Sequence, residues 1–236
     1  MMTAQEILVE LENVGVDSIK KTLMRHGIKE PLYGVKIEEL KKILKRVKEN
    51  HDLSIALYDS GIYDARYLAG LVAEPAKMTK AELQKWVKQA NAPILFETTV
   101  SAVAAEGKYG LELALEWVDS EEEGIACAGW STLSQLVAIK DDKDLDFPLL
   151  KKLMARVVKQ INSAPNRVRY CMNVFIISVG CYVKELNEHA KETARKIGKV
   201  MVDVGDTACM VPSAIDYIAK VEARNSVGKK KKSARC

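Results

Sequence analysis

The sequence has few cysteines, few aromatic residues and no long apolar run, and each shortage excludes a class of protein. Its five cysteines form no CxxC pair, which argues against a zinc site and against a disulfide framework. No run of about 18 apolar residues occurs, and the first fifteen residues are amphipathic and acidic, so we expect neither a membrane span nor a secretory signal. The sequence therefore predicts a cytoplasmic protein without a metal or another cofactor.

The chain is rich in apolar residues and has a cluster of cations at its carboxyl end. It is 236 residues long and 48% hydrophobic, which is enough for one large domain or an elongated repeat array. Residues 224–236 carry six cations and no acid, so the net charge of +4 leaves the rest of the chain slightly acidic. We expect one domain over residues 1–223 and a basic tail over 224–236. The tail is interpreted as a solvated, flexible end, with a phosphate-seeking arm as the alternative.

Helical periodicity runs through almost the whole chain. Three S/T-x-x-E capping boxes predict helix starts, at Thr3, Thr79 and Ser120. Glycines 27, 61 and 107 stand where a left-handed cap would end a helix. The only segment that alternates like a strand is VMVDVG at 200–205, which is too short to found a sheet.

These signals predict about a dozen helices connected mostly by short loops. The expected ranges are 3–13, 17–26, 36–49, 52–59, 63–73, 80–90, 94–106, 109–118, 121–140, 148–162, 165–182, 184–198 and 213–223. Most of these segments are apolar on one stripe only, which favours an all-α, HEAT-like repeat α-solenoid over a compact helical bundle. Such an array has a concave surface formed by its inner helices, and we expect function there.

Two helices carry polar or aromatic groups inside otherwise apolar stretches. In the segment 121–140, Trp130 and Ser134 are four residues apart, with Gln135 beside them. In the segment 165–182, Asn166, Arg169 and Asn173 follow one another at spacings of three and four. The start of that helix, together with Arg167 and Arg169, would suit an anion such as phosphate.

These residues carry a resemblance to a known family. The segments HGIKEPLYGVKIEELKKILK and ALYDSGIYDARYLAGLVA, followed by the Trp-containing and Arg-containing helices, resemble the DNA alkylation repair family of AlkD-like HEAT-repeat proteins. The best-known members of this family are glycosylases that remove N3- and N7-alkylated purines. They use a Trp-x-x-x-Asp arrangement and a later Arg that holds backbone phosphate, so the resemblance assigns these roles to Trp130 and Arg169.

The family's catalytic Asp corresponds to Ser134 in this sequence. A neutral hydroxyl cannot oppose the cation that develops as a glycosidic bond breaks, and a lost term of this kind lowers rates by about a hundredfold or more. We therefore expect DNA binding with weak or absent base excision. Alternative interpretations stay open: Trp130 as a packing residue, Ser134 bonded to a carbonyl one turn earlier, and Arg167 and Arg169 in ion pairs.

The predicted partner is duplex DNA, damaged or distorted, bound along the concave face. The residues expected to contact it are Arg167, Arg169, Asn166, Asn173, Gln135, Lys41 and Lys45, with Trp130 against an exposed base or sugar. The alternative function is a protein-binding helical scaffold, because helical arrays commonly grip partner peptides.

Overall fold

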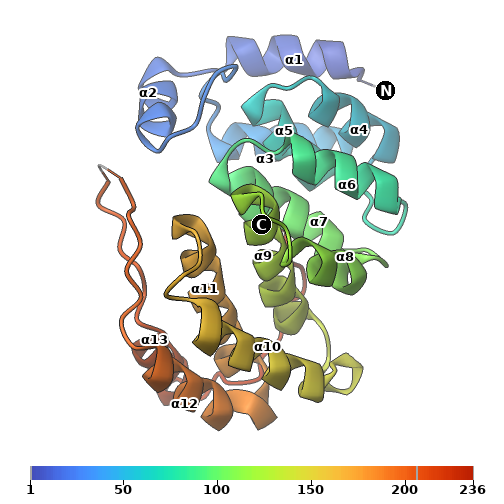
Figure 1. The fold of residues 1–236 in the computed structure, drawn as a ribbon. Helices are drawn as coiled ribbons and strands as arrows, with labels where there is room; N and C mark the ends of the chain where they lie inside the picture. Colours follow the sequence, from blue (N-terminus) through green and yellow to red (C-terminus); the bar gives the residue numbers. More distant parts are fainter. Residues whose placement is uncertain (1, 206, 236) are drawn as a thin grey trace.

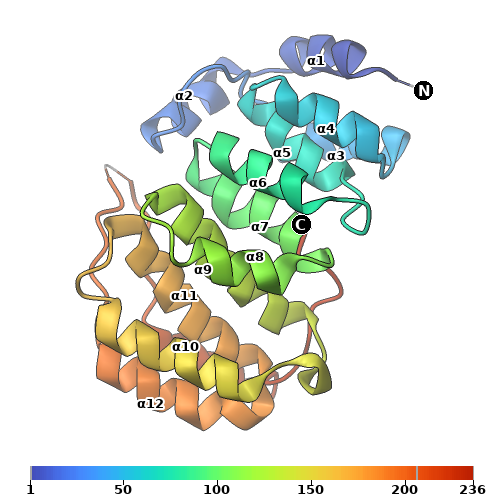
Figure 2. The same cartoon turned by 45° about the vertical axis from the view of Figure 1, so that its right-hand side comes forward.

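The protein is a curved stack of α-helices in a computed structural model that describes residues 2–205 and 207–235. Figure 1 shows the stack running from α1 at one end to α12 and α13 at the other, and Figure 2 shows the same layers turned by 45°. No strand occurs in these two described ranges. The all-α, HEAT-like fold expected from the sequence is therefore confirmed. Within the same ranges, no helix has the length and apolar character needed to span a bilayer.

The helices follow the predicted boundaries closely. They are α1 Ala4–Asn13, α2 Asp17–Arg25, α3 Ile37–Val47, α4 His51–Asp59, α5 Tyr63–Val72, α6 Lys80–Gln89, η1 Leu95–Val100, α7 Ser101–Glu106, α8 Gly110–Trp117, α9 Glu123–Ile139, η2 Asp142–Asp144, α10 Phe147–Gln160, α11 Asn166–Tyr182, η3 Lys184–Leu186, α12 Asn187–Ile197 and α13 Ala214–Ala223. Here η1 is a π-helix, whereas η2 and η3 are short 3-10 helices.

Local start and stop signals are confirmed at most of the predicted positions. The capping boxes of Thr3 and Thr79 both form, with each threonine hydroxyl accepting the amide of the glutamate three residues on. The box expected at Ser120 is wrong, because α9 begins at Glu123 and the Ser120 hydroxyl accepts the Glu122 amide instead. Glycines 27 and 61 are left-handed as expected, whereas Gly107 is not.

The core runs along the stack between an outer and an inner row of helices. The longest helices, α9 and α11, pack against each other, and α9 also packs against α8. A Cβ atom on Gly129 of α9 would stand 2.6 Å from the Val118 amide nitrogen, so a side chain there would force α9 away from the end of α8. This close approach keeps the inner face of α9 at a fixed depth in the stack.

Two segments near the carboxyl end differ from their expected form. Residues 200–205 form no strand, and residues 198–205 and 207–212 lie in a loop beside α11, which we call the α12–α13 loop (Figure 1). Residues 228–235, which we call the strap, lie against the helical body instead of forming a solvated end. Cys236 lies outside the described residues.

Candidate nucleic-acid interface

The inner row consists of α5, η1 with α7, α9 and α11, and its side chains line two hollows. The larger has a volume of about 800 Å³ and lies at the amino ends of α3, α5, η1 and α11. The smaller, about 250 Å³, lies over the middle of α9 and α11. Its lining is mainly small or polar, comprising Glu97, Thr98, Ser131, Ser134, Gln135, Ala138, Tyr170, Cys171, Val174, Ser178, Tyr182 and Lys231.

A polar stripe of α9 lines the smaller hollow, and it lies beside the face of Trp130 that was expected there. Ser131, Ser134, Gln135 and Ala138 recur at helical spacing and all contact this hollow. At 3.6 residues per turn, Trp130 lies about a quarter turn away from the middle of that stripe. The helix therefore presents hydroxyl and amide groups to the concave side and turns its indole into the stack.

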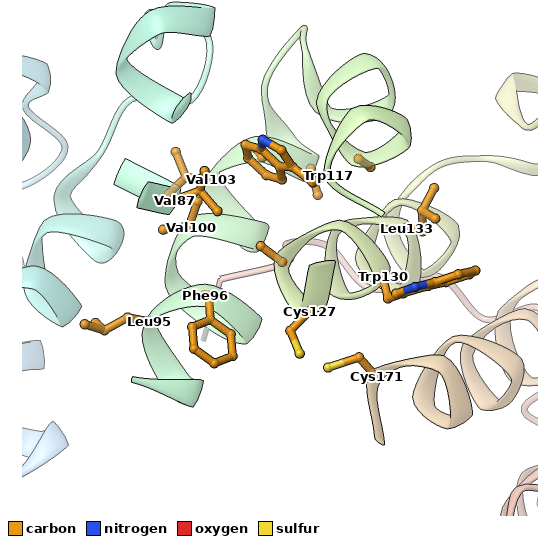
Figure 3. Packing of buried hydrophobic residues seen from close by; sticks show 14 of the residues in the cluster. Val87, Leu95, Phe96, Val100, Val103, Trp117, Cys127, Trp130, Leu133 and Cys171 are labelled. Carbon is orange, nitrogen blue, oxygen red and sulfur yellow. The ribbon is translucent and has the colours of Figure 1, made fainter. Parts of the chain in front are cut away.

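The expectation that Trp130 faces DNA is wrong. Its side chain is 0% exposed, its ring centre lies 5.4 Å from that of Phe175, and the Arg156 guanidinium carbon of α10 lies 5.7 Å from the ring centre. Figure 3 shows the indole pointing away from the place where Cys127 and Cys171 meet. The packing interpretation therefore holds for this tryptophan, and it cannot contact a base or a sugar in this arrangement.

The hydroxyl of Ser134 is committed to its own helix. It donates to the Trp130 carbonyl at 2.8 Å, the back-bond that was the alternative interpretation of this residue. Thr132 makes the same kind of bond to the Ala128 carbonyl. Among the described residues that line the smaller hollow, the only carboxylate is that of Glu97. The described lining of the smaller hollow therefore offers no free carboxylate at Ser134, the position that the resemblance assigns to a catalytic Asp.

Gln135 supports the π-helix η1. Its amide donates to the Glu97 carbonyl at 3.0 Å and to the Ser101 hydroxyl at 2.9 Å. The Ser101 hydroxyl donates to the same carbonyl. In a π-helix the usual i to i−4 bonding is interrupted, so side chains that satisfy the carbonyls stabilise it. Gln135 thus stabilises η1 on the concave face. Its expected contact with DNA stays a prediction.

Arg167 of α11 is held by a carboxylate of the π-helix η1. Its Nε and Nη2 donate to the two oxygens of Glu97, and its guanidinium carbon lies 4.2 Å from the ring centre of Tyr170. Burial alone would lower the pKa of Arg167, but the hydrogen bond to Glu97 and its charge outweigh burial and raise it. The ion-pair interpretation of Arg167 is therefore the correct one, because both Glu97 oxygens are engaged by its guanidinium.

The amino end of α11 is already capped by an anion of the protein. The Glu123 carboxylate accepts the Arg167 amide at 2.6 Å, which is the place where phosphate was expected. Arg169 is half-buried, donates to Asn166 Oδ1 at 3.3 Å and leaves its Nε without a partner among the described residues. A phosphate contact of Arg169 stays a prediction.

Asn166 and Asn173 hold the α12–α13 loop at Asp203 and Pro212. Asn166 donates to the Asp203 carbonyl at 2.7 Å and accepts the Asp203 amide at 2.8 Å, so its side chain pairs with the loop backbone. Asn173 is 0% exposed and donates to the Pro212 carbonyl at 2.8 Å. The DNA contact expected for Asn173 is therefore wrong, because its side chain is buried, whereas that of Asn166 stays a prediction.

Lys41 and Lys45 remain available on α3. Both are exposed, and neither takes part in an ion pair within the described ranges. They continue by one and two turns the face of Ile37, which lines the larger hollow and is 51% exposed. Their expected contact with phosphate stays a prediction that their position allows.

Two thiols and a carboxylate meet beneath the smaller hollow. Potential donor atoms of Glu97, Cys127 and Cys171 all lie within 4.8 Å of one another. Both Glu97 oxygens are engaged by Arg167, and burial raises the pKa of the Cys171 thiol well above its ordinary value. Metal ions bind thiolates and free carboxylates, whereas here the Cys171 thiol is held protonated and the carboxylate is already paired. We therefore interpret Glu97, Cys127 and Cys171 as a buried packing cluster.

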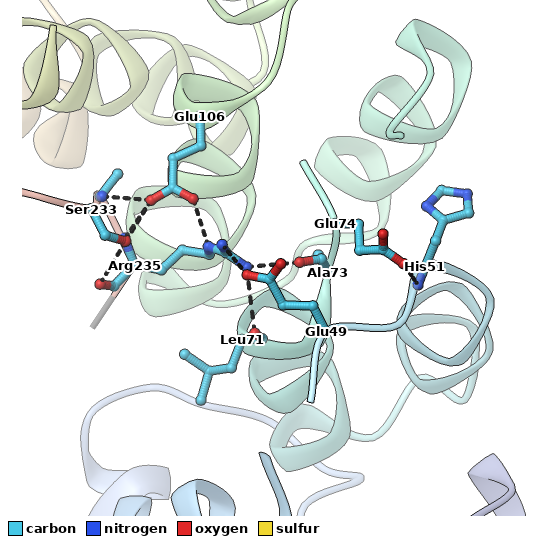
Figure 4. Close-up of polar contacts among 9 residues, drawn as sticks. Glu49, His51, Leu71, Ala73, Glu74, Glu106, Ser233 and Arg235 are labelled. Carbon is cyan, nitrogen blue, oxygen red and sulfur yellow. Dashed lines mark hydrogen bonds and ion pairs between the residues drawn. The ribbon is translucent and has the colours of Figure 1, made fainter. Parts of the chain in front are cut away.

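The strap crosses the carboxyl ends of the four inner helices in succession. The Gly228 amide donates to the Cys181 carbonyl of α11, and the Lys231 amide donates to the Ala138 carbonyl of α9. Farther along, the Ala234 amide donates to Glu106 of α7 at 2.7 Å. Arg235 then donates at 2.7 Å to the carbonyl of Ala73, the C-cap residue of α5. Figure 4 shows the strap contacts at Glu106 and at the end of α5.

Two cations of the strap are engaged by carboxylates as well as by these carbonyls. Arg235 pairs with Glu106 at 2.7 Å and with Glu49 at 2.8 Å. Lys230 donates to the Val137 carbonyl at 2.9 Å and pairs with Asp142 at 2.8 Å. Cations suit helix carboxyl ends, where the unpaired carbonyls carry partial negative charge.

Sequence reasoning missed the aromatic half of this surface. Tyr170 and Tyr182 line the smaller hollow from α11, together with Val174 and Ser178, at successive spacings of four along the helix. That stripe could have been recognised as a second inner face, because its members share one side of a helix. Glu97 carried no local signal, since its partner Arg167 is seventy positions away in the chain.

Comparison with known proteins places this architecture in a family. A family model described as DNA alkylation repair enzyme matches residues 7–217. The chain belongs to the DNA alkylation repair family. It is 34% identical to Lin0241 of Listeria innocua over 96% of this chain and 100% of that protein. It is 32% identical to Lmo0209 of Listeria monocytogenes over 95% and 99%. Both relatives are described as uncharacterized.

A solved structure resembles this member of the DNA alkylation repair family over its entire length. The TM-score is 0.92 with 30% identity, and the match covers 100% of both chains. That structure is described as a new family of proteins related to the HEAT-like repeat DNA glycosylases with affinity for branched DNA structures. The likeness supports a DNA-binding, repair-related function for this family member.

Proposed function

We propose that this protein binds branched or otherwise distorted duplex DNA on its concave face and does not excise alkylated bases. The observation that carries the proposal is the likeness, over the whole of both chains, to a protein described as having affinity for branched DNA. Supporting it, the inner helices present hydroxyl, amide and phenol groups around the smaller hollow, and Glu97 there is neutralised by Arg167. Such a surface can lie against a phosphate backbone without repelling it.

Two features of α9 argue against base excision. The indole of Trp130 is buried between helices, and Ser134, which the resemblance assigns to the position of a catalytic Asp, has a hydroxyl bonded to the Trp130 carbonyl. Neither group can stabilise an oxocarbenium-like sugar. The recognition of damaged DNA and a cytoplasmic location, both expected from the sequence, remain predictions within this proposal.

Binding is tested with a four-way DNA junction and a linear duplex of the same sequence and length. Fluorescence anisotropy titrations at several salt concentrations should show tighter binding to the junction and an affinity that falls steeply with added salt. Equal affinity for both DNAs would remove branch recognition from the proposal. No binding to either DNA at low salt would remove the proposal altogether.

Base excision is tested on methylated duplex with the natural protein and with Ser134→Asp. We expect no release of alkylated bases above background from either, because the added carboxylate would stand beside a tryptophan that is buried. Ser131 lies on the same polar stripe as Ser134, so Ser131→Asp is the matched control for adding a negative charge to the smaller hollow. Robust release by the natural protein would contradict this part of the proposal.

A protein-binding scaffold is the second candidate, and one observation favours it. The larger hollow is lined mainly by apolar and aromatic groups, and its rim includes Met210, which is 88% exposed, and Ile37. Exposed apolar rims of this kind suit a partner peptide better than a phosphate backbone. Met210→Ser with Ile37→Ser should leave junction binding unchanged if DNA is the partner. A protein that binds no DNA and loses a peptide partner in this variant would establish the scaffold instead.

A further inference from the structure

The five cations of the strap fall into two groups that differ in burial. Lys230 and Arg235 are its anchors, with side chains only 15% and 16% exposed. Lys229, Lys231 and Lys232 are exposed, and none of them forms an ion pair within residues 2–205 and 207–235. We call these three residues the ridge. Their ammonium groups are held at the protein surface by a backbone that is pinned on both sides.

The acids that the strap touches do not neutralise the ridge. Asp142 pairs with Lys230, and Glu49 and Glu106 pair with Arg235. Each of these carboxylates therefore opposes an anchor, which leaves the ridge with three positive charges of its own. Exposed lysines with no nearby carboxylate are the groups that exchange their counterions for DNA phosphates.

The ridge lies where the concave face most needs positive charge. The carboxyl ends of inner helices carry partial negative charge and would repel a phosphate backbone. The strap crosses these ends on α11, α9, α7 and α5 and places five cations along that edge. Lys231 itself lines the smaller hollow, 5.6 Å from the ring centre of Tyr182, so the ridge borders the surface proposed to bind DNA.

We infer that the ridge of Lys229, Lys231 and Lys232 contacts the phosphate backbone of branched DNA along the carboxyl-terminal edge of the concave face. This inference rests on the proposed function and names a surface for it. The anchors hold the ridge in place before DNA arrives, so less conformational entropy is lost on binding than for a disordered basic tail. DNA is favoured over a protein partner because the ridge is cationic throughout and has no apolar centre.

The test replaces all three ridge lysines by alanine and compares that variant with a control of equal charge. Lys151, Lys152 and Lys159 of α10 are also exposed, form no ion pair in the described ranges and line neither hollow, so their triple alanine variant is the control. At 100 mM salt the ridge variant should bind a four-way junction about tenfold or more weakly, and its log–log salt slope should fall by about two to three. The control should change affinity by less than about threefold.

A second variant separates charge from side-chain identity. Replacing the ridge lysines by arginine keeps three cations and should keep junction affinity within about twofold. Thermal unfolding of all three variants should match that of the natural protein, because the ridge makes no ion pair and the anchors stay in place.

The outcomes distinguish this inference from the proposed function. If the natural protein binds the junction and the ridge variant binds it equally well, the inference fails and the proposed function stands. Equal weakening of the ridge variant and the α10 control would also contradict the inference, because any surface charge would then serve. If the natural protein binds no DNA, both fail together.

Discussion

The two edges of the concave face use opposite charges for the same purpose. At the amino ends of the inner helices, carboxylates of the protein accept backbone amides: Asp64 of α5 accepts the Tyr33 and Val35 amides of the loop before α3, and Glu123 of α9 accepts the Arg167 amide in the first turn of α11. At the carboxyl ends, the cations of the strap receive the free carbonyls. Carboxylates thus satisfy backbone amides at one edge, and cations satisfy helix carbonyls at the other. The difference is that the strap also brings the three exposed lysines of the ridge to its edge.

The largest loss of stability is expected from the removal of Asp64 at the amino edge. Asp64 is 1% exposed, and its two oxygens accept the Tyr33 and Val35 amides at 2.7 and 2.8 Å. Asp64→Ala should lower the free energy of unfolding by about 3 kcal/mol, because it leaves two amides without an acceptor. Urea denaturation measures this loss.

The control for Asp64 is an acid in the first turn of another helix. Asp17 of α2 is exposed and accepts no side-chain hydrogen bond in the described ranges, so Asp17→Ala should cost less than about 0.5 kcal/mol. Similar losses in the two variants would mean that the Asp64 bonds contribute little beyond a helix-dipole effect.

The second prediction concerns the ion pair between inner helices. Glu97→Gln should destabilise the protein by about 2 kcal/mol, because the Arg167 guanidinium, 29% exposed, would lose the only carboxylate that it pairs with among the described residues. For a chain of this size, calorimetry should show a melting temperature lower by roughly 4–8 °C. Junction affinity at low salt should rise about two- to fivefold, because a cation is released beside the larger hollow.

The exposed pair of Glu112 with Lys80 is the control for Glu97. Glu112 is 60% exposed, so Glu112→Gln should change stability by less than about 0.5 kcal/mol and leave DNA affinity unchanged. A fall in junction affinity in Glu97→Gln would show that Glu97 positions Arg167 for DNA instead of neutralising it.

The third and smallest effect is a pH dependence at the strap edge. Burial would raise the pKa of the Glu106 carboxyl, but the hydrogen bonds from Ser233 and the strap backbone and the charge of Arg235 lower it below its ordinary value of 4.5. A carboxyl with a lowered folded-state pKa stabilises the protein above its ordinary pKa and loses that stabilisation as pH falls through the folded-state value.

Glu106→Gln should therefore cost about 1 kcal/mol at neutral pH, and its difference from the natural protein should shrink as the pH falls below 4.5. Denaturation at a series of pH values measures this, with the exposed Glu185→Gln as control. A difference that stays constant across this range would mean that the Glu106 charge does not hold the strap.

The sequence predicted where the helices lie better than which side of each helix faces the concave surface. Caps and apolar stripes are local, so the start of α1 at Thr3 and the HEAT-like array followed from the residues themselves. Which side of α9 faces inward depends on what packs behind it, and Trp130 was assigned to the wrong side although Ser131 and Gln135 marked the right one. The strap could not be predicted, because Lys230 and Arg235 bind carbonyls 93 and 162 positions away.

The strap also limits how far the solenoid can unbend. A helical array flexes like a spring, since each repeat contacts mainly its neighbours. Between Lys230 at the end of α9 and Arg235 at the end of α5, only five residue steps of chain are available, which span at most about 18 Å when fully extended. Any straightening that stretched this edge farther would have to detach an anchor first, so the segment acts as a tether that sets an upper limit on the opening of the groove.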